Sequence, residues 1–294
     1  MNGEAERARG GIAGTVAALG GEAATLWGEL AGLRRERRAA RPRPPASGLV
    51  VDIGAGHLPH PRADVIVDKY VEDDFERGFA LATAKPLIVA DGQALPFADA
   101  SLAYVITSHV LEHATDPELF AAELSRVGLA GFVQVPTRLA ELGFGWAFHP
   151  WLIDRDDELL VFSPNPGSRP LGTALHDMHG SSALFRLTFF AHRSSWHHTM
   201  HWQGRLRVSV SGHGEARETA GLDLERTLAG LERVPRPPLP SAVVEALRCP
   251  ACRLRLSPQA GAVQCSGCGR AFPMAGGVPV LLLEAALTGV ATSS

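Results

Sequence analysis

The sequence lacks any apolar run of the roughly 18–20 residues that a membrane-spanning helix needs, so it predicts no transmembrane segment. It also shows no secretory signal, because Glu4 and Glu6 stand near its start and the apolar run from Ile12 to Leu19 is short and broken by glycine. These two absences together predict a cytoplasmic protein.

An excess of charge of one sign is also missing. The formal net charge is −3, which gives no reason to expect a nucleic-acid footprint over the whole surface. Lysine is scarce: Lys69 and Lys85 are the only two, so arginine supplies nearly all the positive charge. Hydrophobic residues make up 46% of the 294 residues and charged residues 20%, which is ordinary for a soluble globular protein of one medium domain plus additions.

Cysteine occurs four times, and the spacing of the four is specific. Cys249, Cys252, Cys265 and Cys268 form a CxxC-x12-CxxC pattern, in which two CxxC pairs can surround one Zn²⁺ ion with four thiolates. Disulfides are disfavoured in a cytoplasmic protein, and a thioredoxin-type redox pair uses a single CxxC in a larger unit. The CxxxCxxC pattern of radical enzymes is absent. The sequence therefore predicts a structural zinc site, whose metal supplies much of the folding energy of a small unit.

Phosphate-binding patterns are absent as well. In VVDIGAGHLPHPRADVIVDKY (50–70), Gly54 and Gly56 are followed by Pro59 where the dinucleotide fingerprint has its third glycine. Asp68 stands 14 residues after Gly54, not about 20, and no G-K-[ST] occurs. These departures disfavour nicotinamide, flavin and ATP. The proline-rich segment 57–63 predicts a turn in place of a helix.

Alternation of short apolar runs with helical patterns predicts an α/β fold, with a parallel sheet and helices on both faces. We expect strands at Leu49–Ile53, Val65–Val67, Leu87–Ala90, Leu102–Thr107 and Gly131–Val135, and helices at Phe75–Ala84 and Pro117–Val127. Such sheets bind ligands beyond the carboxyl ends of their strands. Four polar residues follow strand ends and should meet at that edge: Asp52, Asp68, Asp91 and Ser108.

Four motifs in order, VVDIGAG, DVIVD, VADGQALPF and VITSHVLEHATDP, resemble the cofactor motifs of class I S-adenosylmethionine-dependent methyltransferases of the type 11 kind. The resemblance covers residues 50–136 and implies a Rossmann-like sheet that binds S-adenosyl-L-methionine. By this resemblance, each motif contacts one part of the cofactor: Asp52, Gly54 and Gly56 the methionine end, Asp68 the ribose hydroxyls, Asp91, Gly92 and Gln93 the adenine, and Ser108 and His109 the sulfonium.

The chemistry of that cofactor suits the residue types. A sulfonium and an ammonium favour acidic strand ends, because hydrogen bonds between charged groups are the stronger kind. The methyl group is already activated, so the protein mainly positions the acceptor for an in-line displacement. His109 is the candidate base or acceptor-orienting group, whereas Glu112 and His113 are expected to cap and pack the loop.

Residues 136–235 are less regular and rich in aromatic side chains. The segment GFGWAFHPWL (143–152) fits either an acceptor pocket or a small core of an inserted region. Strand-like patterns at Leu184–Phe190 and Arg205–Val210 predict additions to the sheet edge. The histidines of HDMH (176–179) and HHTMH (197–201) are interpreted as solvated or hydrogen-bonded, not as metal ligands.

Proline-rich linkers divide the chain into three parts. Residues 1–45 hold an expected helix at Ile12–Leu33 and a run of arginines from 34 to 43, which is either a solvated tether or a basic arm that touches RNA or an anionic membrane. Residues 46–235 form the methyltransferase-like domain. After VPRPPLPS (234–241), residues 242–294 form the cysteine unit.

The run from Leu247 to Leu283 resembles the small zinc-ribbon activator subunit of tRNA- and release-factor-methylating enzymes. The resemblance implies that the ribbon docks within the chain on its own methyltransferase domain and stabilises or activates it, since a linker raises the effective concentration. Three rival functions stay open: a non-catalytic cofactor-binding or scaffold protein, an RNA-modifying enzyme that holds tRNA with the basic arm and ribbon, and an enzyme that modifies a small molecule or glycan. The sequence leaves the methyl acceptor unassigned.

Overall fold

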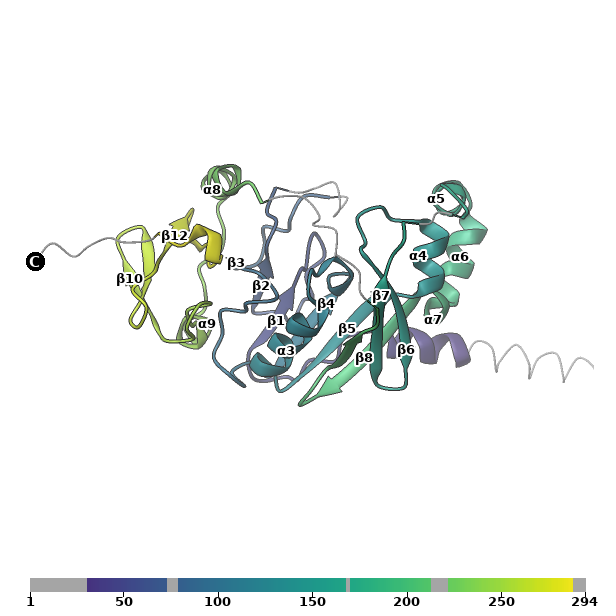
Figure 1. The fold of residues 1–294 in the computed structure, drawn as a ribbon, viewed down its shortest axis with the longest axis horizontal. Helices are drawn as coiled ribbons and strands as arrows, with labels where there is room; N and C mark the ends of the chain where they lie inside the picture. The colour runs from purple at the N-terminus through teal and green to yellow at the C-terminus, as the bar shows by residue number, and fades with distance from the viewer. Residues whose placement is uncertain (1–30, 73–78, 168–169, 213–221, 288–294) are drawn as a thin grey trace, which may run out of the picture.

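The computed structural model describes residues 31–72, 79–167, 170–212 and 222–287. At its centre lies a six-stranded sheet in the order β3-β2-β1-β4-β5-β8 (Figure 1). The first five of these strands in chain order run parallel, and β8 runs antiparallel to β5. The bounds are β1 Val50–Ile53, β2 Val65–Asp68, β3 Leu87–Val89, β4 Tyr104–Ser108, β5 Ala130–Pro136 and β8 His197–Gln203. The five predicted strands are confirmed within two residues at each end.

The order of the strands locates a crevice. The chain adds β2 and β3 on one side of β1, then crosses over and adds β4 and β5 on the other side. Strands β1 to β3 are buried at nearly every position, which explains their continuous apolar sequence. Where the order reverses, the loops after β1 and β4 diverge, and this is the place where open α/β sheets bind ligands.

Helix α3 (Pro117–Val127) covers one face of the sheet. Its start is fixed by Asp116, whose side chain accepts a hydrogen bond of 2.9 Å from Leu119 N, and by the proline that follows. Phe120 and Leu124 belong to the same buried cluster as the side chains of β1 and β4 that point to this face. The sequence predicts this helix with the bounds that the structure has.

Helix α8 (Leu224–Arg233) lies on the opposite face. Leu231 is 1% exposed and packs in a cluster with Ile66 of β2 and Val89 of β3. Since α3 and α8 contact opposite faces, the predicted α/β arrangement with helices on both faces is confirmed.

A second sheet follows β5, in the order β6-β7-β9. It is formed by β6 (Trp151–Asp156), β7 (Leu159–Pro164) and β9 (Arg207–Val210). The strand predicted at Arg205–Val210 is therefore confirmed as β9, although it joins this sheet and not the edge of the main one.

The strand predicted at Leu184–Phe190 is wrong, because this stretch forms α6 (Ala183–Ala191). Ser182 caps the helix by accepting a hydrogen bond of 3.2 Å from Phe185 N. An apolar, aromatic stretch of this length suits a strand or a helix equally, so the cap and the tertiary contacts decide.

Helices α4 (Arg138–Phe144), α5 (Ala174–Ser181), α6 and α7 (Arg193–Trp196) form an insertion at the opposite end of the molecule from the cysteine unit (Figure 1). No residue of α5, α6 or α7 is buried in the described part of the chain. Helix α4 is different, because Glu141 and Phe144 are buried beneath its neighbours.

The segment after β1 forms turns and no helix, as the prolines predict. The helix predicted at Phe75–Ala84 falls partly outside the described residues, and residues 79–84 are not helical, so that part of the prediction is wrong. Here Ala82 N donates a hydrogen bond of 3.0 Å to Gly56 O, which ties the segment across the turn instead of into a helix.

The cysteine unit is an antiparallel sheet of four strands, preceded by a short helix. Its elements are α9 Ser241–Ala246, β10 Leu256–Gln259, β11 Ala262–Cys265, β12 Ala271–Ala275 and β13 Val278–Pro279. Val280 forms a parallel bridge with Val89 of β3, and Leu281 N donates a hydrogen bond of 2.7 Å to Val89 O. This contact covers the outer edge of β3, which would otherwise leave backbone groups unpaired.

Residues 31–39 are helical and lie beside β8, since Ala39 O is 2.9 Å from a ring nitrogen of His201. Most of the helix predicted at Ile12–Leu33 lies outside the described residues. Among the helices that the structure describes, none has the length and apolar character required to cross a membrane.

Candidate functional site

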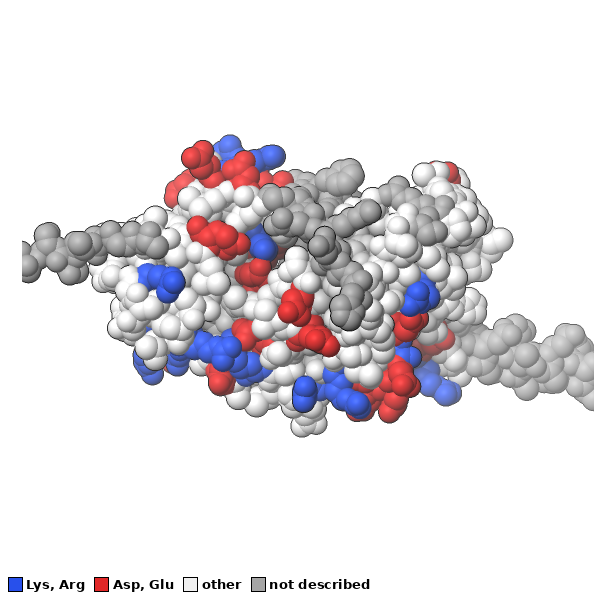
Figure 2. Space-filling model, viewed as in Figure 1, with Lys and Arg blue, Asp and Glu red and all other residues white. Residues whose placement is uncertain are grey.

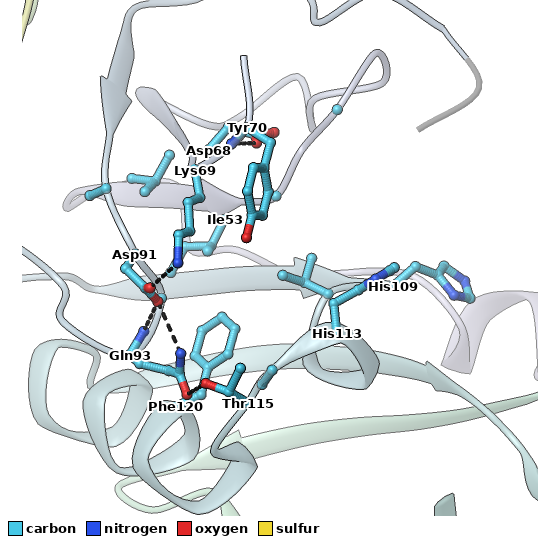
Figure 3. A pocket seen from close by; sticks show the side chains of 17 residues that line it. Ile53, Asp68, Lys69, Tyr70, Asp91, Gln93, His109, His113, Thr115 and Phe120 are labelled. Atoms are coloured by element: carbon cyan, nitrogen blue, oxygen red, sulfur yellow. Dashed lines mark hydrogen bonds and ion pairs between the residues drawn. The ribbon is translucent and has the colours of Figure 1, made fainter. Parts of the chain in front are cut away.

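A cavity of about 210 Å³ opens at the carboxyl edge of the main sheet (Figure 3). Its walls come from the ends of β1 and β2, from the loops after β3 and β4, and from α3. The space is far larger than a water molecule needs. Seven of the residues predicted for the site line it: Gly54, Gly56, Asp68, Asp91, Gly92, Gln93 and His109.

One wall of the cavity is polar and internally bonded. Lys69 Nζ is 2.7 Å from Asp91 Oδ2, and Asp91 Oδ1 accepts a hydrogen bond of 2.8 Å from Gln93 N. Burial lowers the pKa of Lys69, but the bond with Asp91 outweighs burial, so the net shift is upward and the ammonium stays charged. Asp68 Oδ1 accepts a hydrogen bond of 3.1 Å from Tyr70 N, which fixes its carboxylate at the end of β2.

Two glycines make the cavity possible. Gly54 has φ +64°, and a Cβ built there would lie 2.3 Å from a methyl group of Val110. A Cβ on Gly92 would lie 2.1 Å from the ring of Phe120. The chain therefore needs glycine at both positions to bring the strand-end loops this close to α3 and to the loop after β4.

Other residues of the cavity were not predicted as site residues. Figure 3 shows the rings of Tyr70 and Phe120 flanking the space between Asp91 and His113. Phe120 lies in the helix predicted at Pro117–Val127 but was not predicted for the site. Lys69 and Tyr70 are the first two residues after β2, so their position just beyond a strand end was the signal available in the sequence.

His109 begins the loop after β4 in a left-handed conformation, with φ +59°. Its backbone N donates a hydrogen bond of 2.8 Å to Gln134 O, which holds that conformation. The side chain is 44% exposed, and Nδ1 is 3.2 Å from Oε1 of Glu112. Desolvation lowers the pKa of His109, but the bond with Glu112 and its charge outweigh this, and the net shift is upward.

Asp52 and Ser108 do not line the cavity. Asp52 lies inside β1, is 4% exposed, and accepts a hydrogen bond of 2.8 Å from His60 N, so it anchors the proline-rich turn. Burial raises its pKa to about 7. Ser108 is the last residue of β4 and pairs with Gln134 of β5. Their assignment to the methionine and sulfonium ends of a cofactor stays a prediction.

A buried group of acids and histidines lies next to the cavity. Glu141 Oε1 is 2.7 Å from His149 Nδ1, and both side chains are almost fully buried. Burial and the charge of Glu112 raise the pKa of Glu141 to about 9, and burial lowers the pKa of His149 to about 4. Sequence reasoning missed this pair, since Glu141 lies on α4 and His149 lies in the loop before β6.

The aromatic residues of the segment 143–152 mostly pack within the insertion. Phe144 stacks on Trp146 with ring centroids 4.9 Å apart and makes edge contacts with Phe189 and Trp196. None of residues 143–152 lines the cavity. Of the two roles open for this segment, the small core is the one that the geometry favours.

The histidines from 176 to 201 bind protein groups. His176 is bonded to Phe144 O at 2.9 Å, and His198 to Ile153 O at 3.3 Å. In the described part of the chain, the groups that could hold a metal ion contain none of these histidines.

The four cysteines meet at one point of the C-terminal unit, with their sulfur atoms within 4.8 Å of one another. Cys249 Sγ lies 3.7 Å from Cys268 Sγ, and Cys252 Sγ lies 3.3 Å from Cys265 Sγ. A tetrahedral zinc ion with Zn–S bonds of about 2.3 Å separates its sulfurs by roughly 3.8 Å, so the donor set fits Zn²⁺.

Residues 52–131 match the family model described as a methyltransferase domain. These residues run from β1 to β5 and so include the parallel strands of the Rossmann-like main sheet. No curated protein matches the sequence.

Several solved structures are similar over part of the chain. The YcgJ protein from Bacillus subtilis is 21% identical over 36% of this chain and 50% of its own, with a TM-score of 0.27. An S-adenosylmethionine-dependent methyltransferase from Mesorhizobium loti is 15% identical over 52% of this chain and 80% of its own, with a TM-score of 0.27. A complex that contains the Haloferax volcanii Trm112 methyltransferase activator gives 22% identity over 34% of this chain and 50% of the other, with a TM-score of 0.26. This chain therefore spans only half the length of the first and third of these proteins.

Proposed function

We propose that the protein transfers a methyl group from S-adenosyl-L-methionine to an acceptor bound beside His109. The observation that carries the proposal is the cavity at the point where the strand order reverses, which gathers two acidic side chains and three glycines within a methyltransferase domain. A cationic cofactor without phosphate suits such a site, because carboxylates and no phosphate-binding loop line it.

The described side chains fit the parts of the cofactor. Asp68 would accept hydrogen bonds from the ribose hydroxyls, and Gln93 would border the adenine between the rings of Tyr70 and Phe120. Lys69 neutralises Asp91, so the adenine would meet a polar edge without net charge. When bound, the cofactor supplies an already activated methyl group, and the chain supplies position and shielding from water.

His109 would orient the acceptor. Its ring lines the cavity, and the contact of Nδ1 with Glu112 Oε1 at 3.2 Å holds the ring in place, which suits an orienting role. The role of a base stays a prediction.

Calorimetric titration of the zinc-loaded protein with S-adenosyl-L-methionine tests the cofactor. We expect micromolar binding that Asp68→Ala weakens at least tenfold, because the ribose loses its acceptor. Asp156→Ala removes an exposed carboxylate outside the cavity and should leave the affinity unchanged. Equal binding by both variants would refute the role of Asp68, and binding without any turnover of the cofactor would favour a non-catalytic protein.

We also propose that residues 242–294 form a zinc ribbon that docks within the chain on the methyltransferase domain of residues 46–235 and stabilises it. Support comes from the backbone bonds of Leu281 with Val89, and of Arg248 N with Pro96 O at 2.9 Å. Buried side chains join the two parts: Phe272 of the ribbon and Phe97 of the domain are both 0% exposed within one cluster.

A substitution at this contact tests the docking. Val280→Asp places a charge where Val280 is 0% exposed, and should lower the melting temperature and S-adenosyl-L-methionine binding together. Val244→Asp, at a residue of the same unit that is 48% exposed, should change neither. Unchanged stability of Val280→Asp would refute the proposal.

RNA binding by the basic arm and the ribbon stays a prediction. Figure 2 shows a group of basic side chains along the lower left edge of the face that it draws, with acidic side chains beside it.

A further inference from the structure

The second group that could hold a metal ion lies behind the cavity wall. Glu112, His113 and His149 each offer one ligand atom, and these atoms lie within 4.8 Å of one another. Two of them come from the 3-10 helix Leu111–His113, which follows β4, and the third from the loop before β6. The site thus combines two residues that precede β5 in the sequence with one that follows it.

Burial makes this group unlike a surface cluster. The side chain of Glu112 is 0% exposed, and those of Glu141 and His149 are 0% and 7% exposed. Acidic side chains are almost never buried so completely unless they are paired or bind a metal. The carboxyl groups of Glu112 and Glu141 therefore need bonding partners.

Contacts with histidine satisfy only one oxygen of each of the two acids. Glu112 Oε1 faces His109, and Glu141 Oε1 faces His149. The second oxygen of each carboxylate is buried and has no hydrogen-bond partner among the described residues. A buried oxygen without a partner is destabilising, and more so when it is charged, so two in one place call for a ligand.

The partner of His149 matches the surroundings of a metal-bound histidine. Such a histidine nearly always donates its other ring N–H to a carboxylate, which orients the ring. Nδ1 of His149 lies 2.7 Å from Glu141 Oε1, which leaves Nε2 as the nitrogen available to an ion. Glu141 would then be the positioning residue for a ligand and not a ligand itself.

We propose that Glu112, His113 and His149 bind one divalent transition-metal ion of the zinc or ferrous type. Two imidazoles and one carboxylate are a donor set that these ions accept, with at least one coordination position left open. Since His113 also lines the cavity, the ion lies next to the molecule that the cavity binds. This site is separate from the four cysteines and does not depend on methyl transfer.

Metal content measures the proposal directly. The full-length protein is stripped with a chelator, reloaded with Zn²⁺, dialysed and analysed for zinc. We expect about two ions per chain in the unaltered protein, one at the cysteines and one at the buried group. His149→Ala and Glu112→Gln should each reduce this to about one, while circular dichroism shows that the fold is kept. His192→Ala, at an exposed histidine, should keep about two.

Cobalt distinguishes the two sites when it replaces zinc. Thiolate ligands give an intense charge-transfer absorption that imidazole and carboxylate ligands lack. In His149→Ala, the cobalt content should therefore fall while the thiolate absorption stays unchanged. A content of one ion per chain in the unaltered protein, or of two in both His149→Ala and Glu112→Gln, would overturn the proposal.

Discussion

The main sheet with its ribbon and the helical insertion are held in place in different ways. Side chains of β1 to β3 are buried nearly throughout, and Val280 of the ribbon is 0% exposed beside them. Helices α5, α6 and α7 bury no residue, and their aromatic side chains meet around Phe144. Residues of the sheet are packed by neighbours on both faces, so a substitution there should lower the stability of the whole protein. A substitution in the insertion should affect only its own surroundings.

The largest expected effect lies in the ribbon. Cys252→Ser removes one of the four cysteines that would hold the proposed zinc ion, and that ion would supply much of the folding energy of so small a unit. We expect loss of the ion and a loss of stability of about 4 kcal/mol or more, measured by zinc analysis and denaturant unfolding. Ser266→Ala, at an exposed neighbour, is the control. A variant as stable as the unaltered protein would show that the ribbon contributes nothing to the sheet.

Asp52 should make the stability of the sheet depend on pH. Its pKa is about 7 in the folded protein and 3.8 as the ordinary value, so the folded state keeps a proton that the unfolded state loses between pH 4 and 7. The free energy of unfolding should fall as pH rises through that window and level off above it. Asp52→Asn keeps an acceptor for His60 N but cannot ionise. Its free energy of unfolding, relative to that of the unaltered protein, should therefore rise by about 3 kcal/mol between pH 4 and 7. A constant difference over this range would contradict the pKa.

Gly92→Val tests the cavity with a smaller effect. The added side chain meets the ring of Phe120, which must shift and fill part of the cavity. We expect a loss of about 1–3 kcal/mol of stability and a larger loss of S-adenosyl-L-methionine binding. Gly180→Val, at a glycine without a positive φ where an added Cβ meets nothing, is the control without this clash. Unaltered cofactor affinity in Gly92→Val would place the ligand elsewhere.

The smallest effect should come from the insertion. Leu187 of α6 is 61% exposed, so Leu187→Ala should change stability by less than about 0.5 kcal/mol in thermal unfolding. Leu124→Ala in α3, where the leucine is 0% exposed, should lose about 2–5 kcal/mol. Equal losses of stability in the two variants would contradict the view that the sheet is held by buried contacts and the insertion is not.

The same distinction explains what the sequence could predict. Buried strands read as apolar runs that end in Asp68 or Asp91, so the sheet and most of the cavity follow from local patterns. Phe120 lies in a helix that the spacing of apolar residues predicts. Residues that meet across several elements leave no such pattern, and His149 shows this best, because 36 residues separate it from His113.

Local signals also failed where the surroundings override them. Leu184–Phe190 has the composition of a strand, but the cap at Ser182 and the contacts with Phe144 make it helical. The hydrogen bond that Asp52 accepts from His60 N was not predicted either, whereas its assignment to the methionine end of a cofactor stays a prediction. The cysteine unit was the easier part, since each pair of ligands lies within one four-residue motif.

The covered edge of β3 has a consequence for biosynthesis. Val280, which closes that edge, follows Val89 by about 190 residues, and at common rates of translation this takes roughly 10–40 s. Throughout that interval the nascent sheet ends in an open strand that can pair with another chain. The solubility of the new chain would thus depend on a segment made long after the sheet and, with the proposed zinc ion in that segment, on the supply of zinc, so a cell short of zinc is expected to accumulate this protein as aggregate.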